Sequence, residues 1–137
     1  MATHSQSGSI GHHLVRYLKA MGQLDKLKGL ITIDGVGTTF ANSGTTAADW
    51  RNIPYLSLRG YYPGLADATY QNNVAQIRAV GGTADFISLA DPAYGGEFKG
   101  VTHMMMLGTK ASEVFDVILN WANTHIKGGS KKAFCSK

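Results

Sequence analysis

Residues 3–35 read THSQSGSIGHHLVRYLKAMGQLDKLKGLITIDG, and this stretch joins a helical pattern to a short apolar run. Four apolar side chains recur at steps of four, four and three residues, which fits a helix: Ile10, Leu14, Leu18 and Met21. Gly22 follows at the usual stop position of a helix. The run Leu27–Ile33 is rich in leucine and β-branched residues and breaks at Asp34-Gly35, as a buried strand breaks into a loop. The stretch therefore predicts a helix over 9–21 and a strand over 27–33.

The rest of the chain continues the alternation of strands and helices. A second strand is expected over 53–62 and a third over 84–89. Apolar spacing predicts a helix around 70–80 and a last helix from about Ser112. This order is typical of an α/β protein, in which helices cover both faces of a parallel sheet. Three strands alone leave an apolar edge unpaired, so we expect the N-terminal strands of the sheet to be absent from this sequence.

Composition favours one compact domain with a basic end. The chain has 137 residues, of which 44% are apolar and 16% are charged, and this argues against a disordered chain. Its formal charge of +4 depends on a terminal lysine cluster: Lys127, Lys131, Lys132 and Lys137. Such a cluster beside glycines is typical of a solvated, frayed terminus, so we expect no nucleic-acid partner. The predicted organisation is a partial domain over 1–127 and a basic, disordered tail over 128–137.

Several classes of site and location find no support in the sequence. Cys135 is the one cysteine, so the chain can form no internal disulfide and no cysteine cluster for a metal. We expect neither a metal nor a cofactor. No apolar run is long enough to span a membrane, and residues 1–5 lack the basic and apolar parts of a signal peptide. The sequence therefore indicates no particular cellular compartment.

Ser5 stands in a pattern that suits a catalytic nucleophile. The small residues Thr3 and Ser7 flank it, as glycines flank the serine in G-x-S-x-G, and a predicted helix follows. Such a serine sits on a strained turn between a strand and a helix, where large neighbours would clash with the backbone. The alternative is that Ser5 caps the helix, because serine is a common capping residue.

His103 lies in the segment Gly100-Val101-Thr102-His103-Met104-Met105-Met106, between the third predicted strand and the last helix. A histidine at this place in the chain order suits the base of a serine hydrolase built on an α/β fold. The alternative is that the methionines fill gaps in the core and that His103 is a structural residue.

The two segments together resemble a known family. His4-Ser5-Gln6-Ser7-Gly8 is similar to the His-Ser-Gln-Gly/Ser-Gly elbow of a subgroup of serine esterases in the α/β-hydrolase superfamily, with Thr3 in place of the leading glycine. Residues 100–106 resemble the Gly-Asn-Ser-His-Met-Met-Met signature of the same subgroup. The resemblance covers nearly the whole chain. It implies the C-terminal portion of an α/β-hydrolase fold, with Ser5 as the nucleophile and His103 as the base.

The resemblance also implies a carboxylate that orients the histidine. In most α/β-hydrolases this acid follows the strand predicted here over 53–62, but Tyr61 occupies that place. In the methionine-rich subgroup the acid follows the strand after the elbow helix, which makes Asp34 the acid in place of the usual glutamate. A simple turn at Asp34-Gly35 is the alternative, and Asp67 is the reserve candidate for the acid.

The implied reaction is hydrolysis of a small-molecule ester through an acyl-enzyme. The backbone N–H of Gln6 is expected to be one oxyanion donor, whereas the second normally comes from a loop that is not in this sequence. We therefore expect weak or no turnover from this chain by itself. The alternative is a non-catalytic half-domain that binds a partner along its open sheet edge, either a complementing N-terminal half or a second copy. Phe40 and Trp50 are expected either to line the substrate site or to pack as a lid.

Overall fold

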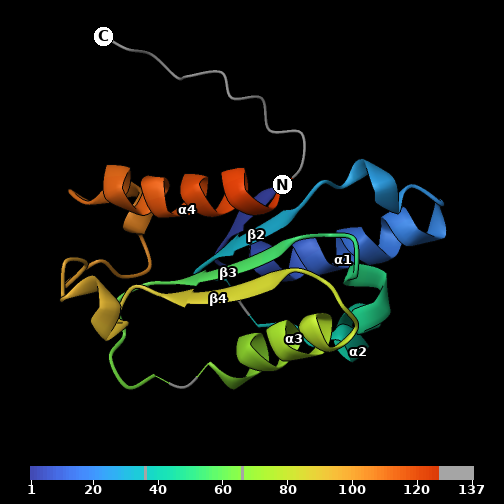
Figure 1. The fold of residues 1–137 in the computed structure, drawn as a ribbon, viewed down its shortest axis with the longest axis horizontal. Helices are drawn as coiled ribbons and strands as arrows, with labels where there is room; N and C mark the ends of the chain where they lie inside the picture. Colours follow the sequence, from blue (N-terminus) through green and yellow to red (C-terminus); the bar gives the residue numbers. More distant parts are fainter. Residues whose placement is uncertain (36, 66, 127–137) are drawn as a thin grey trace, which may run out of the picture.

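The computed structural model of the protein describes residues 1–35, 37–65 and 67–126 (Figure 1). At its centre is a sheet of four parallel strands in the order β1-β2-β3-β4, which is also their order along the chain. The strands are β1 (Ala2–His4), β2 (Leu30–Ile33), β3 (Tyr55–Arg59) and β4 (Ala84–Ser88). The predicted tail over 128–137 lies outside the described residues. The parallel sheet with its flanking helices confirms the predicted α/β class.

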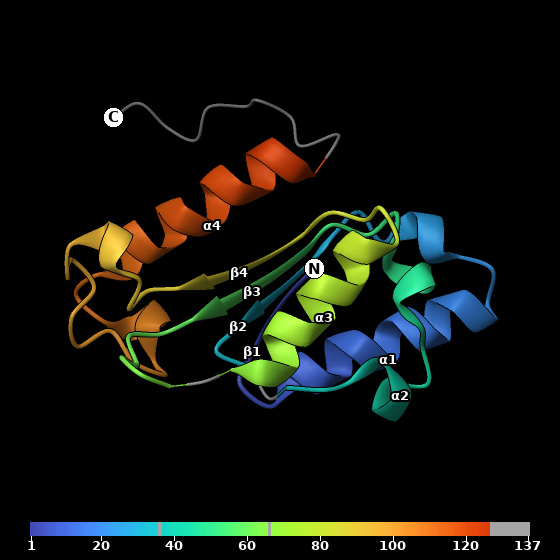
Figure 2. The same ribbon diagram turned by 60° about the horizontal axis from the view of Figure 1, so that its bottom comes forward.

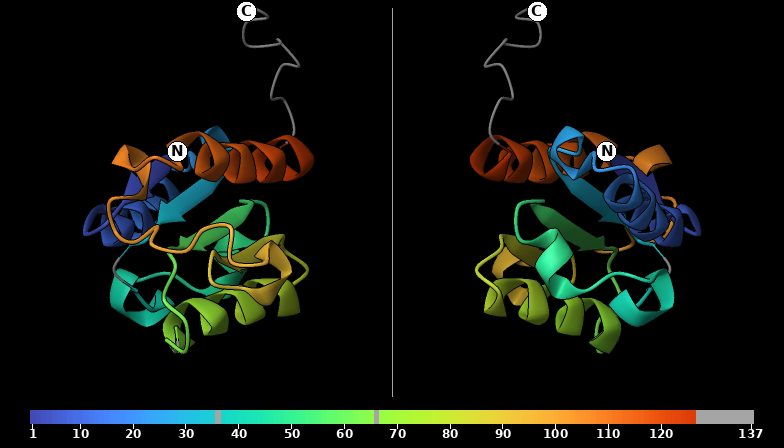
Figure 3. Two further views of the ribbon diagram at one scale, coloured as in Figure 1. Left: turned by 90° about the vertical axis from the view of Figure 1, so that its left-hand side faces the viewer. Right: turned by 90° about the vertical axis from the view of Figure 1, so that its right-hand side faces the viewer.

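Helices cover both faces of the sheet (Figures 1 and 2). One face carries α1 (Ser7–Ala20), the short α2 (Phe40–Ser43) and α3 (Ala68–Ala79), and the other carries α4 (Ala111–His125). The end-on views of Figure 3 show the three layers. Short 3₁₀ turns join these elements: η1 (Leu24–Lys26), η2 (Ala47–Trp50), η3 (Pro92–Tyr94) and η4 (Met105–Leu107). Within the described ranges, every helix is too short or too polar to cross a membrane.

The N-terminal strand β1 differs from the prediction, which placed no strand before Ser5. β1 exists because it pairs with the buried strand β2, not because of any apolar pattern of its own. The Ile31 N–H donates to the Met1 carbonyl (3.0 Å), and the Ser5 N–H donates to the Ile33 carbonyl (3.1 Å). Three residues are too few to show strand periodicity in a sequence. The prediction of three strands was therefore wrong, and Ser5 does follow a strand.

The other elements lie close to their predicted positions, although two strands are shorter. β2 begins at Leu30, not at Leu27, and β3 ends at Arg59. Beyond β3 the backbone turns toward Asp34, whose Oδ1 accepts from the Gly60 N–H at 3.3 Å. This contact uses a backbone donor that would otherwise extend the strand.

The core lies on both faces of the sheet. Between the sheet and α4, side chains of β2 and β3 pack against one face of the helix, formed by Val114, Ile118 and Trp121. On the other face, Val15 of α1 and Ile77 of α3 pack with Phe40 and Trp50 against the sheet. Burial on both faces is the condition for a stable parallel sheet.

Within the described ranges, β1 pairs with β2 alone, so its other edge is free. The helix α1 contacts β1 and carries two exposed apolar side chains on the side away from the core, Ile10 and Tyr17, which are 60% and 62% exposed. Met21, directly after the helix, is 53% exposed. The free edge of β1 and these three residues are called the β1 edge surface below.

Candidate functional site

The predicted site residues meet at the carboxyl ends of the strands. Ser5 follows β1, Asp34 follows β2, and His103 lies in the long loop between β4 and α4. Because all four strands are parallel, their carboxyl ends lie at the same end of the sheet. Ligands of open α/β sheets bind at this carboxyl-terminal end of the strands.

Ser5 occupies a tight turn between β1 and α1. Its φ is +57°, in the left-handed region that few residues other than glycine adopt. Behind it, the Gly8 N–H donates to the Ser5 carbonyl at 3.0 Å, and the hydroxyl of Ser7 bonds with the backbone of His4. Gln6 is the N-cap of α1, and no side chain caps this helix. The structure therefore differs from the capping alternative, and the Ser5 hydroxyl points elsewhere.

The Ser5 hydroxyl faces His103, which in turn faces Asp34. Ser5 Oγ lies 2.9 Å from His103 Nε2, and His103 Nδ1 lies 2.7 Å from Asp34 Oδ2. An ionised carboxylate can only accept hydrogen bonds, so Nδ1 carries the imidazole proton and Nε2 is free to accept from Ser5. The His103 side chain is 46% exposed, whereas that of Asp34 is 2% exposed. An accessible hydroxyl, an imidazole and a buried carboxylate thus form one hydrogen-bonded chain.

Asp34 accepts hydrogen bonds on both of its carboxylate oxygens. Besides His103, Oδ2 accepts from the Tyr62 hydroxyl at 3.1 Å, while Oδ1 accepts from Arg59 Nη1 at 3.1 Å and the Gly60 N–H at 3.3 Å. Four donors satisfy a buried carboxylate and fix its orientation. Asp34 also has a positive φ of +43°. The turn alternative is therefore insufficient, because the side chain of Asp34 is fully engaged in this cluster.

Asp67, the reserve acid, lies one contact further away. Its Oδ2 accepts from Arg59 Nε at 3.0 Å, and no hydrogen bond joins it to His103 among the described residues. The structure therefore brings Ser5, His103 and Asp34 together and places Asp67 behind Arg59.

Sequence reasoning missed three residues that contact this chain of groups: His4, Arg59 and Tyr62. His4 Nε2 lies 2.7 Å from the His103 carbonyl, and the two rings lie 4.8 Å apart. The Arg59 guanidinium lies 5.4 Å from the centre of the Tyr62 ring. Burial and the neighbouring Asp34 carboxylate raise the pKa of Tyr62, so its hydroxyl stays a donor. None of these contacts leaves a pattern in the sequence, since they join residues far apart in the chain.

Gln6, the predicted oxyanion donor, directly follows the nucleophile. Its backbone N–H takes part in none of the hydrogen bonds found among the described residues. It stands at the N-terminus of the 14-residue helix α1, where the helix dipole favours negative charge. This amide is available to a developing oxyanion beside Ser5.

A cleft of about 680 Å³ opens beside these groups. Ser5, Asp34 and His103 line it together with Arg59 and Leu65. Phe40 and Trp50 do not take part, because both are buried in the core between α1 and the sheet. The prediction that they line the site or form a lid was therefore wrong. The cleft is polar, and its one arginine is already paired with two carboxylates.

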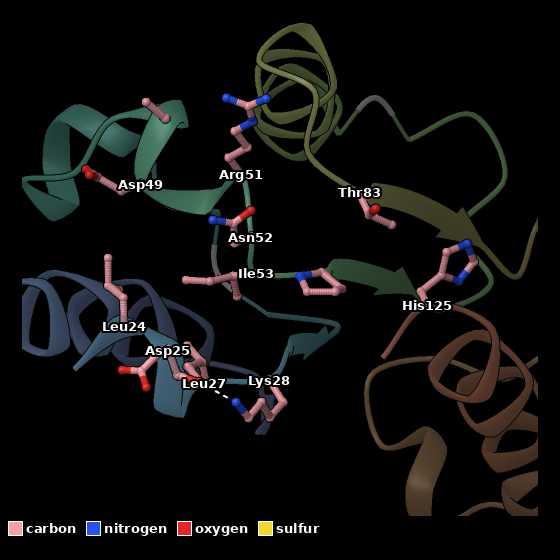
Figure 4. Close-up of a pocket in the computed structure, with 12 residues that line it drawn as sticks. Leu24, Asp25, Leu27, Lys28, Asp49, Arg51, Asn52, Ile53, Thr83 and His125 are labelled. Atoms are coloured by element: carbon pink, nitrogen blue, oxygen red, sulfur yellow. Dashed lines mark hydrogen bonds between the residues drawn. The ribbon is translucent and has the colours of Figure 1, made fainter. Parts of the chain in front are cut away.

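A second hollow of about 640 Å³ lies at the opposite end of the sheet (Figure 4). Its lining includes Lys28 before β2, Pro54 before β3 and Thr83 before β4. Lys28 Nζ donates to the Asp25 carbonyl at 2.6 Å. The labelled side chains of Figure 4 point in different directions and do not converge on one point. This hollow brings together no nucleophile and base of the kind found beside Ser5.

Metal-binding geometry is absent from the described part of the chain: no group of three or more His, Cys, Asp or Glu side chains there is placed to hold an ion. In the comparisons with known proteins, no protein-family model, no curated protein and no solved structure matches this chain.

Proposed function

We propose that this protein is a serine hydrolase that cleaves carboxylic esters through an acyl-enzyme. The observation that carries the proposal is the continuous hydrogen-bonded chain from Ser5 through His103 to Asp34, with contacts of 2.9 and 2.7 Å. A serine is a weak nucleophile unless an adjacent base takes its proton, and the base needs a third group to orient it. The three side chains have the chemistry for these three roles.

The proposed reaction has two steps. Ser5 Oγ attacks the carbonyl carbon of the ester while its proton moves to His103 Nε2, and the carbonyl oxygen becomes an oxyanion facing the Gln6 N–H. His103 then returns the proton to the leaving alcohol, which leaves an acyl group on Ser5. In the second step, His103 Nε2 takes a proton from water as the water oxygen attacks the acyl carbon. The bond from that carbon to Ser5 Oγ then breaks, His103 returns the proton to Ser5 Oγ, and the carboxylic acid leaves.

The local structure supports a relationship to part of the α/β-hydrolase fold. The nucleophile sits between a parallel strand and a helix, at a positive φ, as in a nucleophile elbow. The chain order of Ser5, Asp34 and His103 is that of α/β-hydrolases, whereas other serine hydrolase folds use other orders. The motif resemblance of residues 4–8 and 100–106 points to the same family.

A fluorophosphonate probe tests the proposal without requiring turnover, because it labels a serine only when a base activates it. We expect the probe to modify Ser5, and we expect Ser5→Ala and His103→Ala to abolish the labelling. The matched control is His125→Ala, because His125 is a partly buried histidine at the end of α4, stacked on Trp121. If labelling is absent, or survives in His103→Ala, the hydrolase proposal fails.

A second candidate function is binding of a partner along the β1 edge surface. In the part of the chain that the structure describes, β1 has a free edge, and the adjacent helix α1 carries exposed apolar side chains, a combination that favours strand addition. A second copy is one such partner, because a two-fold axis through the edge would place each apolar face against its own equivalent.

Sedimentation velocity tests this second candidate. Self-association is expected to rise with concentration and to be lost in Tyr17→Glu, whereas Leu65→Glu, at an exposed leucine beside the cleft, should leave it unchanged. A chain that stays monomeric at every concentration excludes the second copy, and a complementing half-domain would then be the remaining partner.

A further inference from the structure

We propose that Asp67 is a positioning residue of the site, acting on Asp34 through Arg59. The inference rests on the proposed hydrolase function. It assigns to Asp67 a role other than that of the proton-orienting acid, since Asp67 bonds to Arg59 and not to His103.

Arg59 lies between two carboxylates and uses different nitrogens for each. Its Nη1 donates to Asp34 Oδ1 at 3.1 Å, and its Nε donates to Asp67 Oδ2 at 3.0 Å. The side chains of Arg59, Asp34 and Asp67 are only 19%, 2% and 9% exposed. A guanidinium group is planar and rigid, so a hydrogen bond to Nε fixes the direction in which Nη1 points. Asp67 therefore sets the direction of the Arg59 N–H group that donates to Asp34.

Asp67 and Arg59 also join two separate elements. Arg59 is the last residue of β3, and Asp67 is the N-cap of α3. The side chain of Asp67 makes no capping hydrogen bond to the helix, so its contact with Arg59 is not a by-product of helix capping. The ion pair instead ties the start of α3 to the strand end beside Asp34.

Loss of the ion pair between Asp67 and Arg59 should change the tautomer of His103. Without Asp67, the Arg59 side chain regains rotational freedom and can move toward solvent, because long flexible side chains have high conformational entropy. Asp34 then keeps only the Gly60 N–H as a donor to Oδ1, at 3.3 Å, so its carboxylate is held less firmly. Its Oδ2 is the atom that holds His103 Nδ1 at 2.7 Å, so the imidazole proton would no longer be confined to Nδ1.

The first experiment reads the His103 tautomer directly by ¹⁵N NMR of the imidazole, at a pH where the ring is neutral. We expect the Nδ1–H form in the native protein and a mixture of both tautomers in Asp67→Ala, which removes the acceptor of the Arg59 Nε–H. Arg59→Lys should give the same mixture, because it keeps the positive charge but loses the planar fork. The matched control is Asp49→Ala. Asp49 is also a poorly exposed aspartate paired with a basic side chain, that of Lys19, but it lies in η2 and not beside Arg59.

The second experiment is a double-mutant cycle on the rate of fluorophosphonate labelling. Asp67→Ala is expected to slow labelling about tenfold in the native background and to have no further effect when combined with Asp34→Asn. This non-additivity follows if Asp67 acts only through the Asp34 carboxylate. A merely structural role would slow labelling by the same factor in both backgrounds and would overturn the inference.

The two measurements separate failure of the inference from failure of the proposed function. An unlabelled native protein defeats the hydrolase proposal, and the tautomer measurement then still decides whether Asp67 orients His103. A tautomer that is unchanged in both Asp67→Ala and Arg59→Lys overturns the inference, even if Ser5 is labelled normally.

Discussion

Ser5 and Asp34 leave two neighbouring parallel strands in the same left-handed backbone conformation, with φ values of +57° and +43°. They are the only non-glycine residues with positive φ in the part of the chain that the structure describes. The Ser5 N–H donates to the carbonyl of Ile33, the residue directly before Asp34, so a backbone hydrogen bond joins the two turns. Strain of this kind is concentrated at functional sites, and here it brings a hydroxyl and a carboxylate to opposite sides of one imidazole.

Replacing Ser5 with glycine should stabilise the protein relative to Ser5→Ala. Both variants lose the hydroxyl and its contact with His103, but only glycine adopts the left-handed conformation without a steric penalty. We expect Ser5→Gly to exceed Ser5→Ala by about 1 kcal/mol in the free energy of unfolding. Urea denaturation measures this difference. Equal stabilities would show that the turn at Ser5 carries no strain.

Asp34→Asn should remove the proposed reactivity of Ser5 while leaving the fold intact. Asparagine tolerates a left-handed backbone and keeps the volume of aspartate, but it cannot balance a protonated imidazole. Labelling of Ser5 should fall on the order of ten-thousandfold, as expected when a triad acid becomes an amide. Labelling rates and thermal melting measure the two effects. Asp67→Asn is the comparison, and a larger loss there than in Asp34→Asn would reassign the acid.

Folding stability should depend on pH through the buried His12. Its side chain packs among Trp50, Phe40 and Tyr55, and neither ring nitrogen has a hydrogen-bond partner among the residues that the structure describes. Burial, and to a lesser degree the charge of His13, lowers the pKa of His12 from 6.5 to about 4. As the pH falls, His12 therefore takes up a proton near pH 6.5 in the unfolded chain but only near pH 4 in the folded chain. Stability conferred by neutral His12 is present above pH 6.5 and is lost as the pH falls through this window.

The expected loss between pH 7 and pH 5 is about 2 kcal/mol, and urea denaturation at the two pH values measures it. In His12→Leu this part of the pH dependence should disappear. The exposed neighbouring residue His13 provides the control, because His13→Leu should keep this pH dependence of stability. A pH dependence that is equal in all three proteins contradicts the assignment to His12.

Gly35→Ala should disturb the site, because the backbone beside Asp34 approaches the elbow closely. A Cβ at Gly35 would lie 3.2 Å from Gly8 Cα and 3.3 Å from both the Ser5 carbonyl oxygen and the Tyr70 hydroxyl. Two of these neighbours are backbone atoms that cannot move aside easily. We expect a loss of about 1–3 kcal/mol in the free energy of unfolding and slower labelling of Ser5.

Gly108→Ala is the control for this crowding, since its Cβ would meet only the Met105 carbonyl oxygen at 3.9 Å. Thermal melting and labelling should show little change there. A Gly35→Ala protein with normal stability and normal labelling would contradict the close approach of the two turns.

The elements of the fold follow from local patterns, with one exception. Apolar spacing predicts α1, α3 and α4 because each helix buries one side, and the run at 27–33 predicts β2 because both faces of that strand are buried. β1 escapes prediction because it has three residues and depends on pairing with β2. Phe40 and Trp50 were misplaced because an aromatic side chain in a loop gives no sign of whether it faces the core or a cleft.

By itself, the sequence determined the α/β class and the two motifs that hold Ser5 and His103, since periodicity and short-range order are written along the chain. Tertiary structure alone showed that Asp34, and not Asp67, contacts His103, and it alone revealed the contacts of Arg59 and Tyr62 with Asp34. The physical reason is that orientation of a buried carboxylate depends on donors from several strand ends. These donors come together only when the parallel sheet has formed.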